Sequence, residues 1–190
     1  MSQTTVTAGG QAIGDPGQID DGGLVTDVVS GFNENAVQMP WGYGLRQGTT
    51  ADFYALASGF SGVLPCVGVN AYSSSHQPAI TLGNGQVIGD LGASGLNQNA
   101  SLRVMRKGRV IVPVEGTVTL GHGAWCRGGA TGSLTQGSWL GAARGGAGPL
   151  GASYHVDCSK QARFVSGTST ASDGTTSVAI LEVDFTNSAY

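Results

Sequence analysis

Turn-forming residues divide this chain into segments that are too short for ordinary helices. Glycine alone accounts for 33 of the 190 residues, and Asn, Asp and Pro add further breaks. No long segment shows a helical period; residues 51–60 come nearest, but a strand or a loop fits them equally well. Short apolar runs between frequent turns are typical of β-sandwiches and barrels. We therefore predict an all-β fold, a jelly-roll or β-barrel-like sandwich.

Ten segments have the composition of β-strands. In residues 181–185, Leu, Val and Phe alternate with Glu182 and Asp184, which predicts a strand with one buried and one solvated face. Pro113 cannot donate a ladder hydrogen bond, so we expect its strand to be an edge strand or to contain a bulge. Gly108 separates that run from the one before it, and we expect a tight turn there. The predicted strands are residues 24–29, 41–46, 63–72, 79–82, 101–106, 109–114, 117–120, 123–127, 161–166 and 177–185.

The beginning of the chain differs from the rest in charge and in pattern. Residues 1–45 contain five acidic and no basic residues, whereas residues 46–190 contain nine basic and seven acidic ones. The first part also lacks the alternation of a core strand, although apolar residues are spaced along it. We predict an extended N-terminal arm over residues 1–40 and a sandwich or barrel domain over residues 41–190. A disordered tail is the alternative for the arm.

Four of the nine basic residues lie within seven positions of the sequence. They are Arg103, Arg106, Lys107 and Arg109. No aromatic residues are interleaved with them, and the chain has no strong basic stripe, so we expect no nucleic-acid partner. An acidic protein surface suits them better, and the acidic arm of a second copy is one such surface. The predicted partner interface joins these cations to Asp15, Ile19, Asp20 and Asp21.

Few groups could support catalysis or bind a metal. Glu182 and Asp184 share a strand face about 7 Å apart, a separation that glycosidases use, but alternating acids on a strand are usually solvated surface. Two His–Cys pairs offer zinc ligands, yet we favour buried thiols, because positions three apart on a strand face opposite sides. The pairs are His122 with Cys126 and His155 with Cys158. We predict no catalytic residues, no cofactor and no metal.

Cysteine and charge content indicate where such a chain works. Its three cysteines are odd in number and widely spaced, which fits reduced thiols in a cytosol rather than a disulfide framework. Charged residues make up 11% of the chain, well below the roughly 25% of an ordinary soluble domain. Charge repulsion between copies is therefore weak, and we expect a protein that packs against neighbours. We find no signal peptide and no apolar run that would span a membrane.

Several segments together resemble the structural cement proteins of tailed bacteriophages. The most specific is RKGRVIVPVEGTVTLGHGAW, residues 106–125. Weaker matches are PGQIDDGG, AVQMPWGYGLRQG, GVLPCVGVNAYS, KQARFVSGTS and TSVAILEVDF. The resemblance covers roughly residues 15–185. The Gly-rich region 128–153 is longer than the family pattern, and we expect a variable surface loop there.

The resemblance implies a decoration protein of the viral capsid without enzymatic activity. Such a protein binds the outer surface of the major capsid protein lattice, bridges neighbouring capsomers and stabilises the head against internal DNA pressure. The implied partners are the major capsid protein and further copies of the chain, as a homotrimer. The implied location is the outer surface of the virion, after synthesis in the bacterial cytoplasm.

Two other interpretations stay open. Jelly rolls often bind glycans, so this one could bind those of a host surface, and aromatic side chains are available to stack on sugar rings. They are Tyr43, Trp125, Trp139 and Tyr154. The chain could also be another virion component, such as the base of a head fibre or a tail protein. An enzyme such as a polysaccharide hydrolase is the least favoured class.

Overall fold

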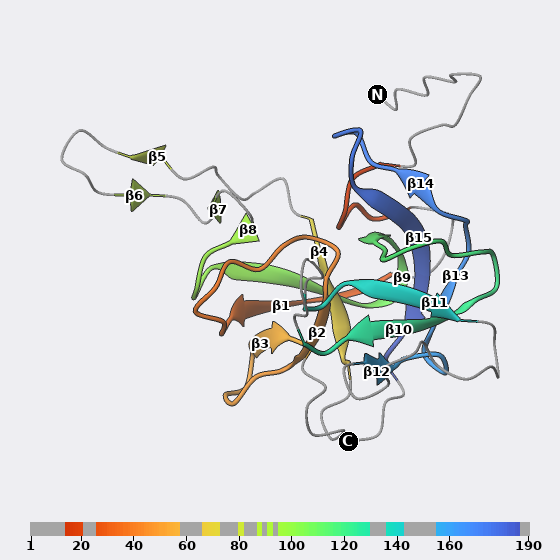
Figure 1. Cartoon of the computed structure of the whole chain (residues 1–190). Helices are drawn as coiled ribbons and strands as arrows, with labels where there is room; N and C mark the ends of the chain where they lie inside the picture. Colours follow the sequence, from red (N-terminus) through yellow and green to blue (C-terminus); the bar gives the residue numbers. More distant parts are fainter. Residues whose placement is uncertain are drawn as a thin grey trace.

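The computed structural model of this chain describes residues 14–20, 26–57, 66–72, 80–81, 87–88, 91–92, 95–129, 136–142 and 155–186. The regular secondary structure within these ranges consists of β-strands (Figure 1), which confirms the predicted all-β, barrel-like class. The described strands are β1 (Asp27–Asn33), β2 (Gly44–Gln47), β3 (Phe53–Leu56), β4 (Gly68–Ala71), β5 (Ile80–Thr81), β6 (Val87–Ile88), β7 (Leu91–Gly92), β8 (Gly95–Leu96), β9 (Ser101–Pro113), β10 (Gly123–Arg127), β11 (Trp139–Ala142), β12 (His155–Asp157), β13 (Ala162–Phe164), β14 (Ser169–Thr170) and β15 (Ser177–Asp184).

Strand β9 is the centre of the fold. Along its first half, β1 pairs antiparallel with one edge and β4 with the other. Strand β1 pairs with β3 in parallel, β3 pairs with β2, and β2 pairs with β4. Since β1 and β4 both pair with β9, these strands close into a barrel. Leu45, Leu56, Leu102 and Val104 are buried in one cluster that fills it.

The second half of β9 belongs to another set of strands. It pairs with β15, and the sheet continues through β13 and β10 to β11. A parallel bridge between Val114 and Trp139 leads from β11 back to the end of β9, so this set also closes on itself. Figure 1 shows β9 (light green) crossing from the side of β1 and β3 to the side of β15 (dark blue). The largest core cluster lies here, around the fully buried Trp139 and Phe164.

A β-bulge in the middle of β9 allows this strand to belong both to the barrel and to the second set of strands. The register with β1 shifts between Asp27 and Val28, which leaves Arg106 as an extra residue in β9. Gly108 has a φ of 128°, a conformation that favours glycine. The tight turn predicted at Gly108 is therefore wrong, because the backbone continues as a single strand from Ser101 to Pro113.

The bulge also exchanges the faces of β9. Leu102 and Val104 lie in the first core, whereas Val110 and Val112 lie in the second. Uninterrupted alternation would keep these four residues on one face, so the extra residue is what turns the strand over. Of the two alternatives inferred from Pro113, the edge strand is wrong, since β9 is central, whereas a bulge is present in this strand at Arg106. The proline itself is tolerated because it is the last residue of the strand.

Residues 14–20 extend the sheet on the β1 side of β9. Ile19 forms an antiparallel bridge with Val110, and its side chain packs against the second core. The N–H of Gly17 donates to the carbonyl of Ile111 over 2.7 Å. The Asp15 carboxylate accepts hydrogen bonds from the backbone N–H, at 3.0 Å, and from the hydroxyl of Ser172. This segment is therefore docked on its own chain, and residues 27–33 just after it form β1.

Sequence patterns placed several strands correctly and missed others. Residues 123–127 form β10, and residues 177–184 form β15. Residues 117–120 form no strand. The backbone N–H of Val118 donates to the hydroxyl of Thr168, and its carbonyl accepts from the N–H of Thr168, so these groups are not paired with a neighbouring strand. The predicted surface loop over 128–153 is wrong for its described part, where residues 139–142 form β11 with Trp139 fully buried. Residues 53–56 form β3, so the helix considered at 51–60 does not form in the described residues 51–57.

Candidate functional site

Charged side chains form a row across β13, β15 and β9, because the strand register places them opposite each other. Glu182 is opposite Arg163 on one side and Arg109 on the other. Its Oε1 accepts from Nη2 and Nε of Arg163 over 2.5 and 3.0 Å, and its Oε2 accepts from Nε of Arg109 over 3.0 Å. Partial burial raises the pKa of Glu182, but the two arginines outweigh it and hold the pKa below its usual value.

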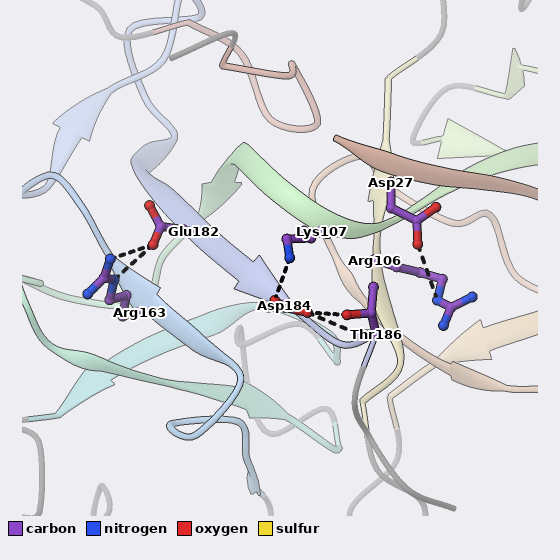
Figure 2. Close-up of polar contacts among 7 residues, drawn as sticks. All are labelled: Asp27, Arg106, Lys107, Arg163, Glu182, Asp184 and Thr186. Atoms are coloured by element: carbon purple, nitrogen blue, oxygen red, sulfur yellow. Dashed lines mark hydrogen bonds and ion pairs between the residues drawn. The ribbon is translucent and has the colours of Figure 1, made fainter. Parts of the chain in front are cut away.

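A second row lies beside the first, across β15, β9 and β1 (Figure 2). Lys107 is opposite both Asp184 and Asp27, and its Nζ lies 3.0 Å from Oδ2 of Asp184. Thr186 donates to the other oxygen of Asp184 from its hydroxyl, over 2.5 Å, and from its backbone N–H, over 3.2 Å. The hydrogen bonds of Thr186, and then Lys107, lower the pKa of Asp184. Arg106 lies 4.0 Å from Asp27.

These two rows make up what we call the charged ladder. Its members are Asp27, Arg106, Lys107, Arg109, Arg163, Glu182 and Asp184. The structure thus brings three of the four predicted cations together and pairs each with a carboxylate of its own chain. Arg103 has no ion-pair partner among the described residues. The expectation that the cations stand at a loop tip is wrong, since they lie along β9.

Asp15 and Asp20, the described acids of the predicted interface, form no ion pair with these cations within the described part of their own chain. Asp15 binds Ser172, and the backbone N–H of Asp20 donates to the carbonyl of Arg109 over 3.0 Å. Asp21 lies outside the described residues. The carboxylates that do bind the cations are Asp27 on β1 and Glu182 and Asp184 on β15. The sequence pattern placed Asp27 in the arm and the other two on a solvated strand face. No local signal links them to β9, because the partners are far apart in the chain.

A groove of about 460 Å³ opens beside the charged ladder, over β9, β15 and the turn before β13. The turn is fixed by the carbonyl of Cys158, which accepts from the N–H groups of Gln161 and Ala162 over 2.9 and 2.8 Å. It carries the exposed Lys160 at the groove. The groove is lined by Lys107, Gly108, Ser159, Lys160, Gln161, Ala162, Arg163, Glu182, Val183 and Asp184.

The two carboxylates considered for a glycosidase do not suit that chemistry. A general acid needs a pKa raised toward the working pH. The pKa values of Glu182 and Asp184 are instead lowered by their cations and hydrogen-bond donors. Both side chains lie in ion pairs, which favour the ionised form over the protonated form that a general acid needs.

Another ion pair, separate from the charged ladder, is buried near the end of β9. Arg127 donates from Nε to both oxygens of Glu115 over 2.6 and 2.8 Å, and from Nη2 to Oε2 over 2.5 Å. The hydroxyl of Ser138 also donates to this carboxylate. The Arg127 and Glu115 side chains are only 7% and 11% exposed, so the pair ties β9, β10 and β11 together inside the protein. The sequence did not reveal this pair, because a single charged residue beside an apolar run usually indicates a surface position.

The histidine and cysteine pairs do not come together as zinc sites. Cys66, Cys126 and Cys158 are all buried in the second core without a disulfide, and burial raises the pKa of the Cys126 thiol. The ring Nε2 of His122 instead lies 2.6 Å from the hydroxyl of Thr119. In the described part of the chain no group of three or more His, Cys, Asp or Glu side chains could hold a metal ion.

The aromatic residues considered for glycan stacking lie in different surroundings. Trp139 is fully buried, and its indole N–H donates to the carbonyl of Gly42 over 2.9 Å. Tyr43 packs against the first core. Tyr154 lies outside the described residues, and Trp125 is half-buried on β10. Trp139 therefore acts as a core residue, and the glycan interpretation loses one of its two tryptophans.

Comparison with known proteins assigns the chain to a family. The family model described as structural cement protein (E217 gp24/Pam3 gp6) matches residues 2–184. The chain belongs to this phage cement protein family. The resemblance found in the sequence is thereby confirmed, and this cement protein is a structural component of the virion capsid that associates with the phage capsid.

A solved structure supports the fold of this cement protein. A chain of "The capsid of Myoviridae Phage XM1" superposes with a TM-score of 0.59 at 12% identity, covering 97% of the cement protein and 98% of that chain. At such low identity the similarity shows a shared fold. No curated protein matches the sequence. In the described residues of the cement protein, no helix is long and apolar enough to cross a membrane.

Proposed function

We propose that this cement protein binds the outer surface of the major capsid protein lattice and bridges neighbouring capsomers. In doing so it stabilises the head against the pressure of packaged DNA. The observation that carries the proposal is the family match over residues 2–184. A copy that buries on the order of 1,000 Å² against the shell is held firmly, and repetition around a closed lattice adds avidity.

The role we propose is structural and without catalysis. The carboxylates that a hydrolase would need are bound in ion pairs, and their pKa values are lowered rather than raised. A charged fraction of only 11% suits a protein that spends its life packed against neighbours. These observations support binding through buried surface as the way the protein acts.

The interface we propose includes the residues that the sequence singled out. They are Asp15, Ile19, Asp20, Asp21, Arg103, Arg106, Lys107 and Arg109. Lys107 and Arg106 are 43% and 37% exposed, so their ion pairs leave donors available to a shell subunit or to a neighbouring copy in a trimer. Ile19 and Asp15 contribute indirectly, because they hold the N-terminal segment against the sheet next to Arg109.

Quantitative mass spectrometry on purified virions tests the lattice role. We expect one copy of the cement protein per major shell subunit, or one per few subunits. A handful of copies per particle would indicate a vertex, head-fibre or tail component instead, and absence from particles would remove the proposal.

Stabilisation needs a separate measurement on particles assembled without the cement protein. Adding the purified protein back should raise the temperature at which the particles release their DNA. If the protein binds but the release temperature stays the same, decoration without reinforcement is the correct description.

A further inference from the structure

In the groove beside the charged ladder, the carboxylate acceptors are mostly occupied, whereas several donors of the cations remain available. Each oxygen of Glu182 already accepts from an arginine, and each oxygen of Asp184 accepts from Thr186 or Lys107. The carboxylates of the groove are therefore largely satisfied within the chain. The same is not true of its cations.

Three cations of the groove keep donors for a partner. Lys160 is exposed and has no ion-pair partner among the described residues. The side chain of Arg163 is 56% exposed and uses only Nε and Nη2 toward Glu182, which leaves Nη1. Lys107 is 43% exposed, and its ammonium group has three donors, of which Asp184 takes one. The groove thus presents donors and positive charge to whatever enters it.

The lining defines the chemistry of the occupant. Its described lining residues include no aromatic side chain on which sugar rings or nucleic-acid bases would stack. Ala162 and Val183 are the apolar side chains among its described lining residues, and both are almost fully buried in the core. Lysine and arginine bind carboxylates through charge-assisted hydrogen bonds. A volume of about 460 Å³ is in the range of binding pockets and can hold a few side chains.

The acidic residues of a second copy are poor candidates for this occupant. Asp15 and Asp27 are bound to Ser172 and Arg106 of their own chain, and Asp20 is held against β9 by its backbone N–H, which donates to the carbonyl of Arg109. An exchange between copies would first have to release these contacts and the backbone hydrogen bonds of residues 17–20. A shell subunit needs no such release.

We propose that this groove receives an acidic segment of the major shell protein, with Lys160 and Arg163 as its principal contacts. The inference rests on the proposed function and gives it a site and a partner chemistry. Lys107 also lines the groove and connects it to Arg106 and Arg109, the neighbouring cations of β9. The carboxylates of the incoming segment bind Lys160 first, because it is the groove's most exposed lysine and has no ion-pair partner among the described residues.

The test compares variants that change charge without disturbing an internal pair. Lys160→Gln and Lys160→Glu alter the groove, and Thr50→Glu is the control, since Thr50 is exposed in the turn before β3 and its substitution changes the net charge as much as Lys160→Gln does. Binding is measured by cosedimentation with capsids that lack the cement protein. We expect about a tenfold loss of affinity for Lys160→Glu, a smaller loss for Lys160→Gln and none for Thr50→Glu.

The outcomes separate the groove from the function on which it rests. If the unaltered protein binds capsids and Lys160→Glu binds them as well as Thr50→Glu does, the groove inference is overturned while the function stands. If the unaltered protein does not bind capsids, the proposed function fails and the shell is excluded as the partner.

A second measurement tests the chemistry of the groove without capsids. Hexaglutamate is titrated into the free protein while backbone amide resonances are recorded by NMR. Shifts confined to residues 159–163 and 182–184, and lost in Lys160→Glu, support the proposal. No shifts in this groove, or larger shifts there with a short DNA duplex than with hexaglutamate, contradict an acidic protein segment as its occupant.

Discussion

Two carboxylates in this protein bind arginine in very different surroundings. Glu115 and Arg127 are 11% and 7% exposed, near the end of β9. Glu182, in the charged ladder, is 21% exposed, and its partners Arg109 and Arg163 are 29% and 56% exposed. The buried pair is closed to any partner, whereas the ladder reaches solvent along the groove.

The difference shows which charges serve the fold and which are available for recognition. Removing one member of a buried pair leaves the other charge without compensation in a poorly solvated place, which costs several kcal/mol. Exposed pairs are solvated and screened, and each contributes little. Charges of the ladder can therefore be altered to test binding while the protein stays folded.

The largest expected effect comes from the buried pair. Arg127→Met should lower the free energy of unfolding by about 3–5 kcal/mol, because Glu115 would stay buried with only Ser138 as a side-chain partner. Urea denaturation followed by tryptophan fluorescence measures this. Arg163→Met is the matched control on the ladder, and an equal loss in both variants would contradict the contrast between the two regions.

Replacing both members of the buried pair sharpens the comparison. Arg127→Met combined with Glu115→Leu should recover most of the stability lost in the single variant, since no unpaired charge remains. A double variant that is less stable than Arg127→Met alone would show that the pair contributes more than charge compensation.

The bulge that positions the ladder should give the next largest effect. Gly108→Ala places a side chain at a φ of 128° and should cost about 1–3 kcal/mol of unfolding free energy. The added Cβ would lie 3.3 Å from Cγ2 of Thr26. Gly167→Ala is the control, because its nearest contact would be 3.7 Å away and its φ is not positive. Equal stabilities in denaturant would show that β9 tolerates the bulge without glycine.

Breaking the ladder itself should have a smaller effect. Glu182→Gln should cost about 1 kcal/mol or less, since Arg109 and Arg163 remain partly solvated once unpaired. The loss should shrink further at high salt, which screens exposed charges. Denaturation at low and high ionic strength measures both. A loss as large as that of Arg127→Met would mean that the ladder behaves as a buried network.

The smallest expected effect is the pH dependence of the ladder. The folded-state pKa values of Glu182 and Asp184 are lowered from 4.5 and 3.8, so the unfolded chain binds protons first as the pH falls. Their contribution is complete above about pH 4.5 and is lost as the pH falls through the lowered values. Glu182→Gln should therefore flatten the fall in stability between about pH 5 and 3. An unchanged profile would assign that fall to other carboxylates.

Parts of the site were visible in the sequence because they depend on local patterns. Alternation over residues 181–185 correctly places the acids of β15 on one face and the apolar residues in the core. The cluster from Arg103 to Arg109 indicated a basic region that the structure does contain. Its surroundings were misjudged at Gly108, because a glycine between basic residues fits a turn and a bulge equally well.

The partners of these charges depend on segments that are remote in sequence. Arg109 and Glu182 meet across 73 residues, and Ser138 meets Glu115 across 23. No local pattern gives such pairings. Trp139, placed in the sequence among candidates for sugar stacking, becomes a core residue because β11 closes the second set of strands.

The sequence by itself determined the all-β class, the faces of its clearest strands and the cement protein family, since turn residues, alternation and family motifs act over short distances. The tertiary structure decided that β9 is one bulged strand shared by a barrel and a second set of strands. It also decided which charges are buried and which face the groove. The physical reason is that strand register is set by the whole sheet, and register alone determines which distant side chains meet.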